Sequence, residues 1–211
     1  MENEEIVKPG RADQLYERYA AVCKDMGVDT PPPLVIKDSK LINAFYNKPR
    51  SAFGAQWGEE KVTLTTGIIK LLDKQELEAV MAHEIGHKID ELKSLGQEKE
   101  KVADRHAAKA LCNPEKLISA LEKMNNYMRN DKDALGALIS YGAGKGMEEL
   151  SIKAVNALPD PALNALRGVI FKMADIHMEL GMDPHPPVPT RAIEIRAIAV
   201  ASPRKKGCEI N

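Results

Sequence analysis

Hydrophobic positions near both ends of the chain recur at the spacing of an amphipathic helix. Apolar side chains three or four residues apart predict a helix over residues 11–26, and the glycine at position 27 favours its end there. A second run of this kind begins near residues 188–191 and continues to about residue 200. The Pro- and Lys-containing residues that follow predict a frayed tail.

The pattern changes between residues 31 and 65. Three consecutive prolines at 31–33 exclude a continuing helix, and the stretches after them are short, β-branched or aromatic, and separated by Gly, Pro and Asn. These stretches predict strands at residues 34–36, 52–53 and 61–65. A small sheet is therefore expected in this part of the chain.

A long helix is predicted directly after the sheet. Asp73 with Glu76 three residues later resembles a capping box, and the helical pattern continues to about Leu95, where Gly96 can end it. Further helices are predicted at residues 97–111, at 113–128 behind an Asn-Pro cap, and from residue 160 behind an Asp-Pro signal. The predicted fold class is α+β, mostly helical, with a small β-sheet before the long helix.

Composition changes this picture little. Hydrophobic residues make up 44% of the 211 residues and aromatic residues only 4%, so aliphatic side chains must build the core. The length corresponds to one or two domains. We expect a helical N-terminal extension over residues 1–30, a main domain over 31–200 and a C-terminal tail over 201–211.

Charge and terminal signals exclude several classes of protein. The formal net charge of −1 creates no field that favours nucleic acid, so no nucleic-acid partner is expected. The acidic start of the chain lacks the basic and apolar segments of a secretion signal. Its cysteines, Cys23, Cys112 and Cys208, are widely spaced and odd in number, which favours a reducing compartment. The predicted location is the cytoplasm.

No apolar stretch reaches the roughly 18 residues that a membrane-spanning helix needs, so a soluble chain without a transmembrane segment is expected. The longest uncharged stretch of the middle region is Ala134–Gly144. It favours a buried helix or a Gly-rich loop over a peripheral contact with lipid.

The candidate chemistry lies in the predicted long helix, at His83-Glu84-Ile85-Gly86-His87. Residues four apart share one face of a helix, so His83 and His87 can bind one ion while Glu84 projects beside them. A zinc ion suits this pair of imidazoles. The alternative interpretation is a solvated helix that happens to carry two histidines.

A catalytic zinc site normally takes three protein ligands and leaves the fourth position to water. The longer motif that would supply a third histidine is excluded, because the chain has Asp90 and Lys93 where that motif needs Gly and His. The third ligand is therefore sought among carboxylates further along the chain.

Glu100 and Asp104 lie four residues apart on the next predicted helix, so both can face the zinc helix. In that arrangement Glu100 would bind the ion, and Asp104 would accept the free N–H of a ligand histidine, for which we favour His83. Glu98 and His106 are the competing candidates for the third ligand.

The residues Thr65–Ile69, Gln75–His87 and Glu100–Asp104 together resemble the zinc helix, its lead-in and the third-ligand helix of the HtpX and CAAX-prenyl-protease family of gluzincin metallopeptidases. The resemblance implies a zincin-like fold and one Zn²⁺ per chain. It implies His83, His87 and Glu100 as ligands, with Asp104 supporting them.

Two further segments carry the same resemblance. Asn43-Ala44-Phe45, behind Pro31–Ile36, is similar to the family's substrate-binding strand, which implies that these three residues lie near bound peptide. The segment from His185 to Arg191 resembles the family's His-Pro-Pro and following Arg, which implies that His185 lies at the active site.

The roles of these last residues follow from ordinary chemistry. His185 is a candidate donor to the negative charge that develops on a carbonyl oxygen, and its alternative is a histidine in a turn. Arg191 is expected to support the site by ion pairing, and His177 lies in an apolar helical pattern and is expected to be structural.

Family members commonly carry transmembrane helices and a long insertion between the ligand helices, so this chain resembles a compact soluble version.

The predicted function is a zinc-dependent endopeptidase that acts on a peptide or protein substrate through a zinc-activated water, with Glu84 as general base. One alternative is a zinc-stabilised interaction module without catalysis, and another is a peptidase dedicated to a single regulatory protein. Glu84 favours an enzyme, because a structural zinc site needs no base beside the metal and usually closes the fourth position.

Overall fold

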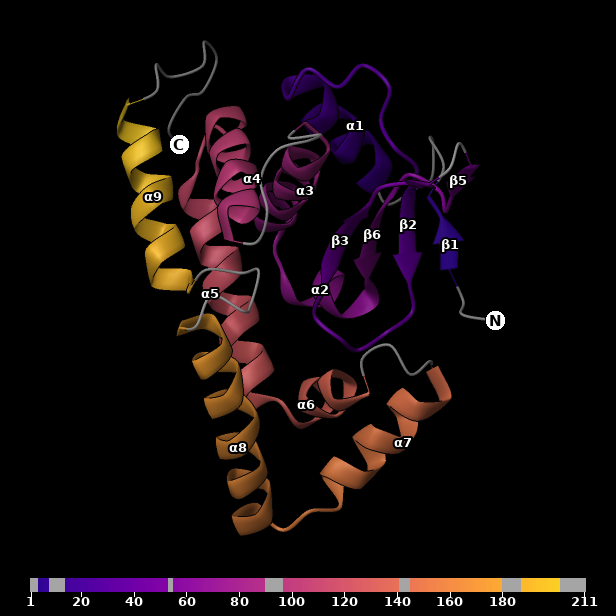
Figure 1. Cartoon of the computed structure of the whole chain (residues 1–211), viewed down its shortest axis with the longest axis vertical. Helices are drawn as coiled ribbons and strands as arrows, with labels where there is room; N and C mark the ends of the chain where they lie inside the picture. Colours follow the sequence, from indigo (N-terminus) through magenta and orange to yellow (C-terminus); the bar gives the residue numbers. More distant parts are fainter. Residues whose placement is uncertain are drawn as a thin grey trace.

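A mixed sheet forms one side of the molecule, with helices beside and below it (Figure 1). The computed structural model describes residues 4–7, 14–52, 55–89, 97–140, 145–179 and 187–201. The described strands are β1 (Glu4–Ile6), β2 (Leu34–Lys37), β3 (Ala44–Asn47), β4 (Arg50–Ala52), β5 (Ala55–Trp57) and β6 (Lys61–Thr65).

The strand order in the main sheet is β1-β2-β6-β3, and β4 and β5 form a separate antiparallel pair. β2 and β6 are parallel, whereas β1 and β3 pair antiparallel to their neighbours. Among the described strands, β3 is therefore an edge strand, paired with β6 alone. Its other side contacts the long helix that carries the candidate chemistry.

Along the chain, the first described helix lies between β1 and β2, and all the others come after the last strand, β6. The described helices are α1 (Leu15–Asp25), α2 (Thr66–Leu71), α3 (Lys74–Ile89), α4 (Gln97–Ala110), α5 (Glu115–Asn130), α6 (Lys132–Ile139), α7 (Lys145–Asn156), α8 (Asp160–Glu179) and α9 (Val188–Ala201). The predicted mostly helical α+β class is thus confirmed.

Most predicted elements are found within a few residues of their predicted bounds. The strands predicted at 34–36 and 61–65 are β2 and β6, and the helices predicted from residues 97, 113, 160 and 188 are α4, α5, α8 and α9. Ala52 ends β4, whereas Phe53 lies outside the described residues, as does the predicted end of the long helix over 90–96. Of Ala134–Gly144, the part up to Ile139 belongs to α6, where Ala134, Leu135 and Ala137 are buried.

Some elements were not predicted. β1 and β3 are three or four residues long and show no clear alternation, so only their pairing partners define them. The six-residue helix α2 begins at an N-cap, where Thr65 Oγ1 accepts from Ile68 N–H at 3.3 Å.

One hydrophobic core joins the sheet to α1 and α3. Tyr19 from α1, Leu34 and Leu64 from the sheet, and Met81 and Ile85 from α3 are all fully buried in it. α1 therefore packs in the same core as the long helix, while the predicted division into three segments stays a prediction. A separate cluster of Leu135, Val155 and Leu163 holds α6, α7 and α8 together.

Two findings bear on the predicted environment. No helix in the described part of the chain is both long and apolar enough to cross a membrane. Cys23 is a free, buried thiol. Cys112 is disulfide-bonded, whereas the odd number and wide spacing of the cysteines favoured reduced thiols. Spacing along the chain does not report which thiols lie close in space. The cytoplasmic location stays a prediction.

Candidate metal centre

Helix α3 is fixed at its start by the predicted capping box. Glu76 N–H donates to Asp73 Oδ1 and Asp73 N–H donates to Glu76 Oε2, both at 2.9 Å. Glu76 is buried, and it also accepts from Ser119 Oγ at 2.7 Å and Lys123 Nζ at 2.8 Å on α5. The first turn of α3 is thereby tied to α5, and the buried helix runs from there to the two histidines.

Helix α4 approaches α3 at Gly86, between the histidines. A Cβ atom at Gly86 would lie 2.7 Å from the carbonyl oxygen of Ala103 and 2.8 Å from its Cα. Ala103 and Ala107, the small residues on this face of α4, are fully buried. The lack of a side chain at Gly86 and the small alanines facing it bring Glu100 and Asp104 within reach of the histidines.

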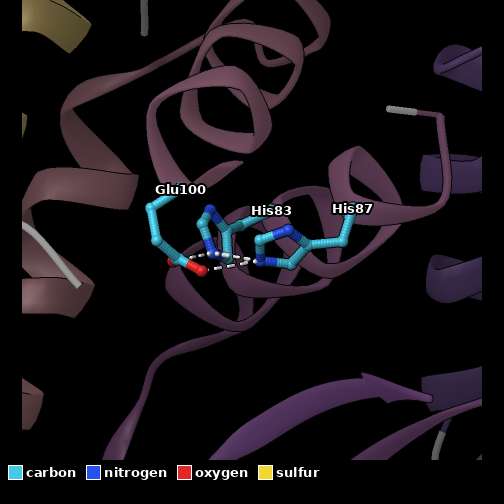
Figure 2. Close-up of side chains that lie close together, drawn as sticks. All are labelled: His83, His87 and Glu100. Atoms are coloured by element: carbon cyan, nitrogen blue, oxygen red, sulfur yellow. Dashed lines mark hydrogen bonds and ion pairs between the residues drawn. The ribbon is translucent and has the colours of Figure 1, made fainter. Parts of the chain in front are cut away.

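His83, His87 and Glu100 point toward one another from α3 and α4 (Figure 2). The two Nε2 atoms lie 3.1 Å apart, and they lie 3.2 Å (His83) and 3.4 Å (His87) from the carboxylate oxygens of Glu100. A tetrahedral ion with bonds of 2.0–2.1 Å would hold its ligands about 3.3 Å apart. Each imidazole lies nearest to a different oxygen of Glu100, and the three side chains offer ligand atoms that all lie within 4.8 Å of one another, close enough to share one ion.

Asp104 and Arg191 support His83 from behind. The Nδ1–H of His83 donates to Asp104 Oδ1 at 2.9 Å, which leaves the Nε2 lone pair directed at the centre. Arg191 on α9 donates through Nε and Nη2 to the two oxygens of Asp104, each at 2.7 Å, and all three side chains are buried. The fork of Arg191 therefore fixes the carboxylate that fixes the histidine.

The pKa values describe a site that favours positive charge on the imidazole. Burial would lower the pKa of His83, but the hydrogen bonds with Asp104 and Glu100 outweigh it and raise the pKa to about 9. Burial would likewise raise the pKa of Asp104, but the hydrogen bonds from Arg191 and His83 hold it below its usual value. A bound divalent cation supplies the same positive charge that a proton would supply on His83.

Glu84 lies beside this group and is not among the three clustered donors. It is buried, and its Oε2 accepts from the backbone N–H of Tyr46 on β3 at 2.8 Å. The carboxylate is thus directed from the long helix toward the edge strand.

Asn43, Ala44 and Phe45 lie where the chain enters β3. The carbonyl oxygen of Asn43 accepts from the Thr65 N–H at 3.1 Å, and the Asn43 N–H donates to Thr65 Oγ1 at 3.1 Å, so Asn43 extends the β3–β6 pairing by one residue. In such a ladder the backbone groups of the next residue, Ala44, point away from the neighbouring strand. They face the same edge as the Tyr46 N–H that Glu84 contacts.

The other residues that the sequence singled out, as far as the structure describes them, do not belong to the group of three donors. Glu98 is exposed on α4 and lies 4.0 Å from Arg105, and it is not in the donor group. His106, also on α4, is half-buried and likewise outside this group. His177 belongs to α8, and His185 lies outside the described residues.

The sequence did not indicate Tyr46, Glu60 and Lys88, which form a further network that reaches Glu84 through the backbone of Tyr46. The Tyr46 hydroxyl donates to Glu60 Oε1 at 2.7 Å, and Lys88 on α3 forms an ion pair with the same carboxylate. These residues come from separate segments that share no motif, so only the adjacency of Lys88 to His87 could have drawn attention to it.

Part of the chain, including the two histidines of α3, is similar to a known peptidase family. Residues 9–91 match peptidase family M48. The chain is 36% identical over 86 residues to a protein named Protease HtpX homolog of Methanothermobacter thermautotrophicus, a match that covers 40% of this chain and 30% of that protein. No solved structure gives a significant match.

Other relatives give a similar result. The identity is 38% over 85 residues to Protease HtpX homolog 1 of Sulfolobus acidocaldarius and 32% over 82 residues to Protease HtpX homolog of Thermococcus sibiricus. These matches cover 40% and 39% of this chain but only 25% and 26% of those proteins, so the chain spans less than a third of the length of such relatives. The resemblance to HtpX-like peptidases of family M48 is thereby confirmed.

Proposed function

We propose that this protein is a zinc-dependent endopeptidase of zincin-like, gluzincin fold. The observation that carries the proposal is the grouping of the His83, His87 and Glu100 ligand atoms within 4.8 Å of one another, with the two Nε2 atoms 3.1 Å apart, which suits a metal ion with an open fourth position. The match to peptidase family M48 supports a peptidase, because its range includes His83, Glu84 and His87. Glu100 lies beyond that range and rests on the geometry.

The residues of the site either bind the ion or hold a residue that binds it. His83, His87 and Glu100 bind the ion, and Asp104 holds His83 in the tautomer whose Nε2 is free to bind, while Arg191 holds Asp104. Bound zinc would act as a Lewis acid toward the peptide carbonyl and would lower the pKa of a water molecule.

Glu84 is the proposed general base. It accepts a proton from the attacking water and passes it to the leaving amine, so that peptide hydrolysis needs no other proton carrier. Its burial and its hydrogen bond from the Tyr46 N–H keep the carboxylate in one position beside the three ligand atoms. His185, outside the described residues, is proposed as a second donor to the developing negative charge.

The edge strand β3 is the proposed binding site for substrate. A peptide or protein segment in extended conformation can add to the outward side of Asn43, Ala44 and Phe45 through the backbone groups of Ala44. This places the peptide along the side of β3 from which Tyr46 contacts Glu84. The substrate is therefore proposed to be an unfolded or flexible segment and not a folded surface.

The experiment that tests the proposal uses zinc-loaded protein and a diverse peptide library. Cut sites are identified by mass spectrometry with and without a chelator, and zinc is then added back. We expect cleavage that the chelator abolishes and zinc restores. A library that stays intact, with one zinc bound and the fold retained, would favour a non-catalytic module or a peptidase with one protein target, and screening protein substrates would separate these two.

A further inference from the structure

Tyr46 contacts both Glu84 and the ion pair of Glu60 with Lys88. Its backbone N–H donates to Glu84 Oε2 at 2.8 Å, and its side-chain hydroxyl donates to Glu60 Oε1 at 2.7 Å. One residue of the edge strand is therefore fixed at two points, one in the main chain and one at the far end of its ring.

Glu60 connects this strand to α3. It lies just before β6, and its Oε1 receives both the Tyr46 hydroxyl and the ammonium group of Lys88, which follows His87 on α3. Burial would raise the pKa of Glu60, but the hydrogen bonds from Lys88 and Tyr46 lower it, with help from nearby Lys48. Glu60 therefore stays ionised at neutral pH and can hold both donors.

The edge strand needs such a connection. β3 has four residues and, within the part of the chain that the structure describes, makes ladder hydrogen bonds with β6 alone, so little in the sheet fixes the distance between its outer side and α3. The side chain of Tyr46 packs against the core that α3 shares with the sheet, which brings the hydroxyl to Glu60. A shift of β3 by about 1 Å would move the Tyr46 N–H away from Glu84, and misplacement of that size can cost about 100-fold in rate.

We propose that Tyr46 and Glu60 are positioning residues, which with Lys88 form a clamp that holds β3 against α3 and so orients the Glu84 carboxylate. The role in the reaction rests on the proposed function. The clamp itself is a property of the fold and holds whether or not the protein cleaves peptides.

On the outer side of β3, the clamp uses the backbone N–H of Tyr46 and leaves the backbone groups of Ala44 for the substrate. The Tyr46 N–H is used by Glu84, while the backbone N–H and C=O of Ala44 point away from β6. Ala44 is then the position on this strand where an added peptide strand pairs, which places the peptide next to the carboxylate that Tyr46 orients.

The test combines two single variants and their double variant in zinc-loaded protein. Tyr46→Phe removes the hydroxyl and keeps the backbone N–H, and Glu60→Gln removes the charge that holds Lys88. Tyr16→Phe on α1 and Glu78→Gln on the other side of α3 are matched controls, because they make the same chemical changes at half-buried positions away from Glu84. The measurements are amide hydrogen exchange at Tyr46, zinc content, and kcat and KM on a cleaved peptide.

Both single variants should speed exchange of the Tyr46 amide by about 10-fold or more and lower kcat by about 5- to 50-fold, with KM and zinc content near the parent values. Because the two residues act through one contact, the double variant should be little worse than the poorer single variant. Exchange and kcat equal to those of the controls would overturn the clamp. If the parent cleaves neither peptides nor the screened protein substrates, the proposed function fails, while the exchange rates still decide the clamp.

Discussion

The imidazole of His83 shows how neighbouring charges prepare a single residue for a metal. One ring nitrogen donates to Asp104, and the other faces Glu100 and His87 at 3.1–3.2 Å. A buried carboxylate and two ring nitrogens at this spacing need a positive charge between them. The pKa of His83 is raised to about 9 for the same reason, because a proton on the ring supplies part of this positive charge.

Glu100 is the proposed ligand that distinguishes this site from a pair of histidines. Glu100→Gln removes the only negative charge among the three donors, so zinc content measured by elemental analysis after dialysis should fall well below one per chain. Glu98→Gln, two residues away on an exposed face of α4, should keep the full zinc content. Loss of zinc from the Glu98 variant instead would move the third ligand.

Asp104 is proposed to act on the metal through its hydrogen bond with His83. Asp104→Asn keeps a hydrogen-bond acceptor but leaves the Arg191 guanidinium facing a neutral amide, so zinc affinity should fall by about 10- to 100-fold. Competition with a chelator of known affinity measures the change. An affinity equal to that of the parent would mean that Asp104 only stabilises the fold.

At the scale of the elements, the site depends on how closely α3 and α4 approach each other. Gly86 makes this approach possible, and small alanines on α4 complete it. The capping box at Asp73 and Glu76 fixes the other end of α3 against α5. The two ends of one helix are thus held by different means, close packing at one and hydrogen bonding at the other.

Gly86→Ala tests the close packing. The added methyl group would lie 2.7–2.8 Å from backbone atoms of Ala103, so α4 must shift, which should lower the free energy of unfolding by about 1–3 kcal/mol and weaken zinc binding. Gly168→Ala on α8 is the control, because its methyl group meets nothing within 4 Å and should leave stability unchanged or raise it by up to about 1 kcal/mol. Equal effects in urea unfolding would contradict this account of the crossing.

The lowered pKa of Glu76 makes the free energy of unfolding depend on pH. Burial would raise the pKa of Glu76, but the hydrogen bonds from Lys123, Ser119 and the Asp73 backbone lower it. A carboxyl group with a lowered pKa contributes stability above its unfolded-state pKa and loses it as pH falls through the folded-state value. Glu76→Gln should therefore cost about 1–3 kcal/mol in urea unfolding at pH 7, and the difference from the parent should shrink as pH falls below about 4. A difference that stays constant with pH would contradict the charged role.

At the scale of the whole molecule, the sequence predicted those parts of the site that depend on local spacing. The two histidines, Glu100 and Asp104 follow from residues four apart on consecutive helices, and the capping box from residues three apart. The edge position of β3 and the network of Tyr46, Glu60 and Lys88 could not be predicted in this way. They depend on pairing and packing between distant segments, which hydrophobic periodicity does not encode.

The most direct test of the central claim is Glu84→Gln in zinc-loaded protein. Glutamine keeps the size of the side chain and can still accept the Tyr46 N–H, but it cannot take a proton from water. The account predicts that peptide cleavage falls by a factor of about 100 to 10,000, while zinc content and the midpoint of unfolding stay near those of the parent. A variant that cleaves peptides as fast as the parent would contradict it, and so would a variant that loses zinc or unfolds.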